Sequence, residues 1–129
     1  MIVRASQLGQ MESSVYLEFE KRVTIWLAAI FPDDCHWLGP QGTAERIRHS
    51  VQVAARYGFS SQRDIASFAY LSFLLGPNFD AEERYSWVRQ ILKRPNLPPG
   101  APIDQAVDEV AARLDLGPLE SLDFEEDEL

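Results

Sequence analysis

The stretch Ile65-Ala-Ser-Phe-Ala-Tyr-Leu-Ser-Phe-Leu-Leu75 decides the fold class of this sequence. Apolar residues occupy nearly every side of the helix that it would form, and a helix without a polar face is surrounded by other elements. The preceding Ser61-Gln-Arg-Asp64 has the form of a capping box in which Asp replaces the usual Glu. The stretch therefore predicts a central helix that begins at residue 60 or 61 and ends at about residue 75.

Four further helices are predicted around the central one. Apolar residues at helical spacing indicate helices over residues 14–31, 43–57, 80–94 and 102–114. Gly58 follows the second of these, where a left-handed C-terminal cap is expected. Asp80-Ala-Glu-Glu83 resembles a capping box for the fourth. We expect residues 32–42 to form a connection with at most one short helical turn, and the proline-rich residues 95–102 to form a stiff linker.

No stretch alternates between apolar and polar residues for more than a few positions, so strands are not expected. The fold class is therefore all-α, a single compact bundle of about five helices with an apolar central helix. The chain divides into a helical bundle domain, residues 1–115, and an acidic C-terminal tail, residues 116–129. Residues 1–12 remain ambiguous between a short extended piece and a short helix.

Length and charge limit the function further. The 129 residues are about one domain, and a net charge of −8 has the wrong sign for a general nucleic-acid binder. Cys35 is the single cysteine, so no internal disulfide can form, which favours a reducing compartment. The most apolar stretch, residues 65–75, has eleven residues and contains two serines, whereas a membrane span needs about twenty, and no signal peptide is evident. We expect a cytoplasmic protein with no membrane partner.

The acidity is concentrated in the tail. The first 115 residues hold 12 Lys and Arg against 14 Asp and Glu, so the tail carries −6 of the −8. Leucines and Phe124 are interspersed among its acids. Two interpretations remain open, a solvated disordered end and a short segment that docks on a basic partner with an apolar groove. In either case we expect the tail to add nothing to the core.

Residues typical of catalysis do not form a recognisable pattern. Cys35 and His36 are neighbours, whereas a thiol–imidazole pair needs side chains that face each other from separate elements. With His49 they are the only Cys and His residues, too few for a four-ligand zinc site. No glycine-rich phosphate loop or hydrolase motif occurs. We therefore expect no enzyme, no cofactor, no metal site and no small-molecule substrate.

Residues 57–66 imitate the entry to a helix-turn-helix, the element with which many proteins read DNA. A recognition helix with exposed polar residues should follow after a tight turn. The chain instead continues as an apolar helix, and the next helix begins with acidic residues, which would repel phosphates. DNA binding is therefore only the third hypothesis.

Several aromatic and basic residues are candidates for protein contacts. Trp37 and Phe79 lie in connections, and Trp87 is offset from the apolar face of its helix. Such residues either fold back over the core or serve as interface anchors, where Trp and Tyr are enriched. Arg56 and Arg63 flank a turn, where they can pair with Asp64 or Asp80 or present guanidinium groups to a partner.

Four segments in this order resemble small helical accessory proteins of bacterial type VI secretion effector clusters. They are Phe19-Glu-Lys-Arg22 through Pro32, Arg56-Tyr-Gly58, Ser61-Gln-Arg-Asp-Ile65, and Leu75-Gly-Pro-Asn-Phe-Asp80 followed by Trp87. The resemblance covers residues 2–114 without the tail. It implies a cytoplasmic co-chaperone that helps an adaptor chaperone to load a toxin effector onto the secretion spike. The resemblance does not assign a functional role to any individual residue.

The leading hypothesis is accordingly a non-enzymatic binding protein of this kind. The alternative is an immunity protein that binds and neutralises a toxin encoded beside it. The expected partner is a protein, an adaptor chaperone and through it a toxin effector, with no nucleic acid. The candidate partner-binding residues are Trp37, Arg56, Arg63, Phe79, Trp87, Phe124, Glu125, Glu126, Asp127 and Glu128.

Overall fold

The all-helical fold is confirmed by a computed structural model, which describes residues 13–116 and Phe124. Within this part of the chain there are five α-helices, two short 3₁₀ turns and no strand. The elements are α2 (Ser13–Ile30), α3 (Pro32–Arg56), α4 (Gln62–Leu75), η1 (Phe79–Ala81), η2 (Glu83–Tyr85), α5 (Ser86–Leu92) and α6 (Ala101–Arg113).

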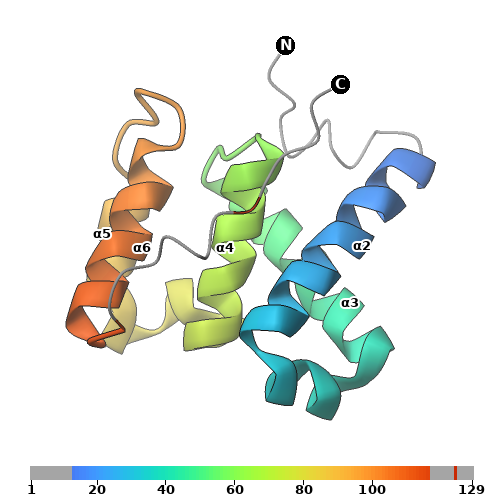
Figure 1. Cartoon of the computed structure of the whole chain (residues 1–129). Coiled ribbons are helices and arrows are strands. Elements are labelled where there is room, and N and C mark those ends of the chain that lie inside the picture. The colour runs from blue at the N-terminus through green and yellow to red at the C-terminus, as the bar shows by residue number, and fades with distance from the viewer. Residues whose placement is uncertain (1–12, 117–123, 125–129) are drawn as a thin grey trace.

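Helix α4 is the centre of the bundle, as predicted. Figure 1 shows α2 and α3 on one side of it and α5 and α6 on the other. Helix α2 packs mainly on α3, α5 packs on α6, and α4 contacts both α3 and α6. Phe68, Leu71 and Ile65 of α4 are at most 1% exposed, so the helix without a polar face is indeed enclosed.

Local signals position both ends of α4. Ser61 is its N-cap, and its hydroxyl oxygen accepts a hydrogen bond from the Asp64 backbone amide at 3.1 Å. Before it, α3 ends in a Schellman motif, in which the amides of Gly58 and Phe59 bond the carbonyls of Ala55 and Ala54. Gly58 has φ +84, a left-handed conformation that glycine adopts without strain. The predicted cap and the predicted glycine end are both confirmed.

An ion pair joins α2 to α3. Arg48 of α3 donates from Nε and Nη2 to the two carboxylate oxygens of Glu20 at 2.8 and 3.1 Å. Glu20 is 7% exposed, and this bidentate pairing satisfies a carboxylate that would otherwise be costly to bury. Glu18, Glu20, Lys21 and Arg22 form a polar stretch that predicts a solvent-facing side of α2, and for Glu20 that prediction is wrong.

The prediction for residues 32–42 is also wrong. Helix α3 already begins at Pro32, and the segment predicted as a connection is helical on both sides of Gly39. Gly39 has φ +74 and ψ 171, so the chain turns there between a short N-terminal piece and the main body of α3. A helix that begins at residue 43, as predicted, would take Thr43 as its N-cap, but Thr43 lies within α3 and its hydroxyl donates to the Cys35 carbonyl at 3.4 Å.

The predicted capping box at residues 80–83 does not form. The chain makes η1 and η2 there, and α5 begins only at Ser86. Asp80 makes a tertiary contact instead, since the Tyr57 hydroxyl donates to its Oδ2 at 3.0 Å. Arg89 donates to the Asp80 backbone carbonyl at 3.0 Å, which further holds this short turn in place.

Phe124 belongs to the hydrophobic core. Its ring is 6% exposed and meets the rings of Phe19 and Trp26 edge-on, at centroid distances of 6.1 and 5.5 Å. The guanidinium carbon of Arg22 lies 5.2 Å from its centroid. The expectation that the tail adds nothing to the core is thus wrong at this residue. The rest of the tail beyond residue 116, including Glu125, Glu126, Asp127 and Glu128, lies outside the described residues, as do residues 1–12.

A search of the described helices for a membrane span finds none that has the length and the apolar character to cross a bilayer.

Candidate functional site

Trp37 is the most exposed aromatic side chain in the described part of the chain. It lies in the short piece of α3 before the turn at Gly39, and 79% of its surface is accessible. Cys35 and Leu38 of the same piece pack against the core, so the segment is anchored while Trp37 faces solvent. Trp is enriched among the residues that dominate binding energy at protein interfaces. This is the position expected of an interface anchor.

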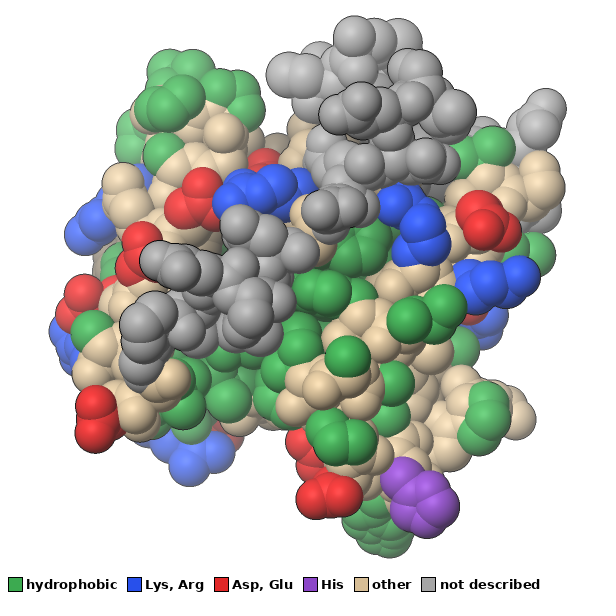
Figure 2. All heavy atoms as spheres, in the orientation of Figure 1, with side chains coloured by type: hydrophobic (Ala, Val, Ile, Leu, Met, Phe, Trp, Pro, Cys, Tyr) green, Lys and Arg blue, Asp and Glu red, His purple; other side chains and the backbone are tan. Residues whose placement is uncertain are grey.

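Acidic side chains accompany this tryptophan. Asp33 and Asp34 are exposed in the first turn of the same helix, where they also suit the positive end of the helix dipole. Figure 2 shows hydrophobic side chains protruding beside acidic ones at the lower end of the molecule, where α2 meets α3 in Figure 1. We call Asp33, Asp34 and Trp37 the acidic corner. An aromatic anchor with a negative border matches a partner surface that combines an apolar groove with basic edges.

Helix α2 contributes further exposed apolar residues. Leu17 is 52% and Ile25 66% exposed, and exposed Lys21 lies between them. The three residues follow at spacings of four, so they form one row along the outward side of the helix.

A second surface feature is a basic cavity of about 690 Å³ at the ends of α3 and α5. Within the described part of the chain, four Lys and Arg residues line it, whereas Asp80 is the single Asp or Glu residue that does so. The residues that give it its character are Arg56, Tyr57, Asp80, Arg89, Lys93 and Arg94. The cavity is therefore positive in an otherwise acidic chain.

A hydrogen bond inside the basic cavity joins two of the motifs noted in the sequence, Arg56-Tyr-Gly58 and Leu75-Gly-Pro-Asn-Phe-Asp80. It is the bond from Tyr57 to Asp80 described above. Burial raises the pKa of Tyr57 to about 12, and the charge of Asp80 adds to this, while Arg89 and Arg56 act in the opposite direction. The phenol thus remains a neutral donor, and it occupies one carboxylate oxygen of Asp80, the single acidic residue among the described residues that line the cavity.

Trp87 lies beside a cavity of about 600 Å³ between α5 and α6. The guanidinium carbon of Arg113 lies 3.9 Å from its ring centroid, so the cation covers one face of the indole. Arg94 lines this cavity as well as the basic one, and its Nη1 donates to Gln105 of α6 at 2.8 Å. Trp87 is partly buried, and the structure gives it an intramolecular role in joining α5 to α6.

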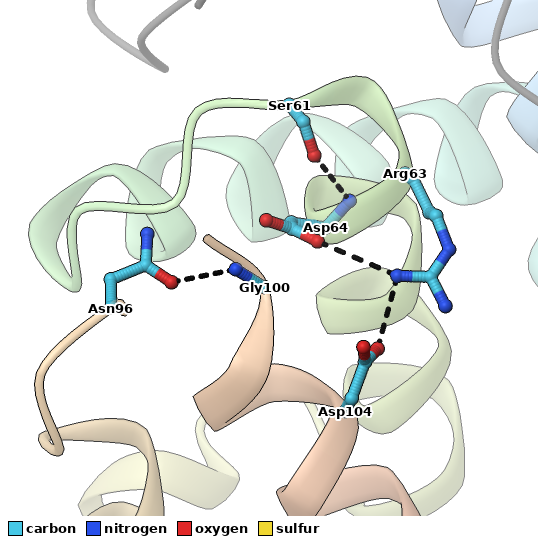
Figure 3. Close-up of polar contacts among 6 residues, drawn as sticks. All are labelled: Ser61, Arg63, Asp64, Asn96, Gly100 and Asp104. Atoms are coloured by element: carbon cyan, nitrogen blue, oxygen red, sulfur yellow. Dashed lines mark hydrogen bonds and ion pairs between the residues drawn. The ribbon is translucent and has the colours of Figure 1, made fainter. Parts of the chain in front are cut away.

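Arg63 also makes intramolecular contacts. Figure 3 shows its guanidinium between two carboxylates, with Nη1 3.0 Å from Asp104 Oδ1 and 3.8 Å from Asp64 Oδ1. Since Arg63 and Asp64 belong to α4 and Asp104 to α6, these ion pairs connect the N-terminal ends of the two helices. Pairing with Asp64 is one of the alternatives considered for Arg63, and it is present, although the contact with Asp104 is closer.

The same cluster explains why a glycine occupies position 100. Gly100 is the N-cap of α6 with φ +91, and its amide donates to Asn96 Oδ1 at 2.8 Å. A Cβ atom on Gly100 would lie 2.9 Å from Asp64 Oδ1 (Figure 3). Asp64 is 5% exposed, so its carboxylate has little room to move away. The cluster is a structural joint between α4 and α6.

Two further candidates are buried by the protein itself. Phe79 is 0% exposed, and its ring lies 5.2 Å from that of Phe68. Phe124 packs on α2 as described above. Neither side chain is presented to a partner, because loop and tail aromatics here fold back to seal the core. Arg56, in contrast, is exposed at the edge of the basic cavity.

Within the described residues no group of three or more His, Cys, Asp and Glu side chains is arranged to hold a metal ion. Cys35 is partly buried, and burial raises the pKa of its thiol, which lowers the fraction of reactive thiolate.

The basic cavity was missed by the sequence reasoning. Its cations come from two helix ends more than thirty residues apart in the chain, and basic residues at such ends are ordinarily explained by the helix dipole. The bond between Tyr57 and Asp80, which brings the segments together, has no local sequence signal. Comparison of the chain with protein-family models, curated proteins and solved structures finds no match.

Proposed function

We propose that this protein is a non-enzymatic binding protein, a cytoplasmic co-chaperone that contacts an adaptor chaperone and assists it in loading a toxin effector onto the type VI secretion spike. The observation that carries the binding role is the acidic corner. A tryptophan that is 79% exposed, on a segment anchored by Cys35 and Leu38, leaves a large apolar side chain unpaired. The secretion context rests on the resemblance of the sequence motifs.

The geometry of the acidic corner supports a protein partner. Trp37 lies on a short helical piece held by the turn at Gly39 and by the packing of its neighbours, so its backbone is already ordered. An ordered anchor loses little conformational entropy on binding. Asp33 and Asp34 are exposed, so their charges can steer a basic partner without the cost of desolvating a buried ion.

The test is co-expression with the adaptor chaperone and with the toxin encoded beside the protein, followed by size-exclusion chromatography and a measurement of affinity. We expect a complex with the adaptor, and we expect Trp37→Ala to weaken it by about thirtyfold or more, the loss that corresponds to a hot-spot residue. Leu97→Ala is the matched control, because Leu97 is also 79% exposed but lies in the loop between α5 and α6.

If the two variants bind the adaptor with equal affinity, the acidic corner is not part of the interface. A complex with the toxin alone that abolishes toxicity would overturn the co-chaperone role in favour of an immunity protein.

A further inference from the structure

The basic cavity holds more positive charge than the fold uses. Among the residues that the structure describes, Arg56 and Lys93 have no ion-pair partner, and both are exposed at its edge. Arg89 and Arg94 each use one Nη1 group, on the Asp80 carbonyl and on Gln105. Since a guanidinium has five N–H donors, both retain donors for a further ligand.

Asp80 does not cancel this charge. Its Oδ2 accepts a hydrogen bond from Tyr57, and its single negative charge is outnumbered by the four cations of the cavity. The local balance is strongly positive, although the chain as a whole carries −8. Opposite potentials on one small protein attract different kinds of partner to different faces.

The helix dipole explains these cations only in part. Arg56 lies in the last turn of α3, Arg89 in the last turn of α5, and Lys93 is the C-cap of α5. Each would offset the negative end of its own helix. Offsetting a helix dipole does not require the cations to share a cavity. If this were their whole role, neutralising Arg56, Arg89 and Lys93 would lower the stability of the fold and would not affect the binding of a ligand.

We propose that the basic cavity binds an acidic segment of a protein partner through the carboxylates of successive Glu or Asp side chains. The proposal rests on the proposed function as a protein-binding factor, and it adds a second contact with the opposite charge preference to the acidic corner. Arg side chains bind carboxylates in a bidentate manner, and the partly exposed ring of Tyr57 provides apolar surface for the methylene groups of the segment.

The arrangement of the cations in the basic cavity suits an extended peptide better than a single phosphate group. Arg56, Lys93 and Arg94 are all exposed, and they come from the end of α3, the end of α5 and the loop that follows α5. Charges that are spread over the edge of a cavity of about 690 Å³ match carboxylates that are spaced along a peptide.

The test uses fluorescein-labelled hexaglutamate as the acidic probe and hexaglutamine as its neutral counterpart, followed by fluorescence anisotropy. The protein should bind hexaglutamate but not hexaglutamine, and the affinity should fall as salt shortens the screening length. Arg56→Gln combined with Lys93→Gln should weaken binding by about tenfold, since exposed charge pairs contribute modestly. The double variant should melt close to the parent protein, which excludes a purely structural role.

Lys21→Gln combined with Arg84→Gln is the matched control, because it removes the same charge from exposed positions outside the basic cavity. Equal weakening in both double variants would show that net charge is responsible and would overturn the proposal. No binding of hexaglutamate at low salt would do the same.

Two further results would reassign the basic cavity. Displacement of the peptide by inorganic pyrophosphate at lower concentration than by unlabelled hexaglutamate would identify a phosphate-bearing ligand. A concentration-dependent dimer that Arg56→Gln with Lys93→Gln abolishes would identify a second copy of this chain as the occupant. Trp37→Ala should leave hexaglutamate binding unchanged, so failure at the cavity and failure of the proposed function are distinguishable.

Discussion

Replacing Phe124 by Ala tests whether this residue stabilises the bundle. Phe124 is 6% exposed and covers the rings of Phe19 and Trp26 on α2. Burying a Phe side chain contributes about 2 kcal/mol, and two edge-on aromatic contacts add about 0.5 kcal/mol each at the lower end of their range. The substitution should therefore destabilise the fold by about 3 kcal/mol.

The mechanism of this loss differs from that of an interior cavity. Phe124 covers α2 from outside, so its removal exposes the rings of Phe19 and Trp26 to water instead of leaving an enclosed void. The value should accordingly lie below the largest losses, about 5 kcal/mol, that are known for Phe→Ala changes in closed cores. Phe124→Leu retains most of the apolar area and should lose less than half as much.

Thermal and urea unfolding followed by circular dichroism measure the effect. A loss of about 3 kcal/mol corresponds to a fall in Tm of roughly 10 °C for a domain of this size. Leu116→Ala is the control, because Leu116 is 41% exposed and its truncation should change Tm by less than about 2 °C. Equal Tm values for Phe124→Ala and Leu116→Ala would refute the role of Phe124 in the core.

Alkaline pH and glycine substitution provide further tests. The pKa of Tyr16 and that of Tyr57 are each raised from 10.0 to about 12, so between these values the folded state holds protons that the unfolded state has lost. This contribution to stability should be fully present below pH 10 and fall as pH rises toward 12. Burial also raises the pKa of Tyr70, so spectrophotometric titration should show three phenols that ionise late, one of which disappears in Tyr57→Phe. Gly58→Ala should cost about 1 kcal/mol from left-handed strain alone, because nothing lies within 4 Å of its Cβ position. Gly100→Ala should cost clearly more in urea unfolding, because its Cβ would also lie 2.9 Å from Asp64 Oδ1; equal costs would contradict the close contact.

What the sequence could predict was determined by local interactions. The N-cap at Ser61, the end of α3 at Gly58 and the enclosed character of α4 all depend on residues within a few positions of one another. Helix α6 was placed within one residue for the same reason, although Leu114, which continues the spacing of its apolar residues, is 46% exposed.

What the sequence could not predict depends on distant contacts. Asp80 looked like a cap, but its carboxylate is engaged by Tyr57, 23 residues earlier, so α5 begins later than its local pattern indicates. Phe124 looked like part of a charged tail, because nothing near it in sequence reveals the rings of α2 that it covers. The candidate site was predictable at Trp37, whose position between acids and a Gly-Pro turn is local, and at Arg56 as a single residue. The cavity around Arg56 was not, because it requires the end of α5.

The central position of α4 also determines how the molecule comes apart. Helices α2 and α3 form one pair and α5 and α6 another, with few direct contacts between the pairs in the described part of the chain. Thermodynamic coupling between them must therefore pass mainly through α4. One pair can separate from α4 while the other stays packed, whereas loss of α4 removes the surface on which both pairs pack. The acidic corner belongs to the first pair. A partner bound there can therefore change the stability of the second pair only as far as α4 resists local opening.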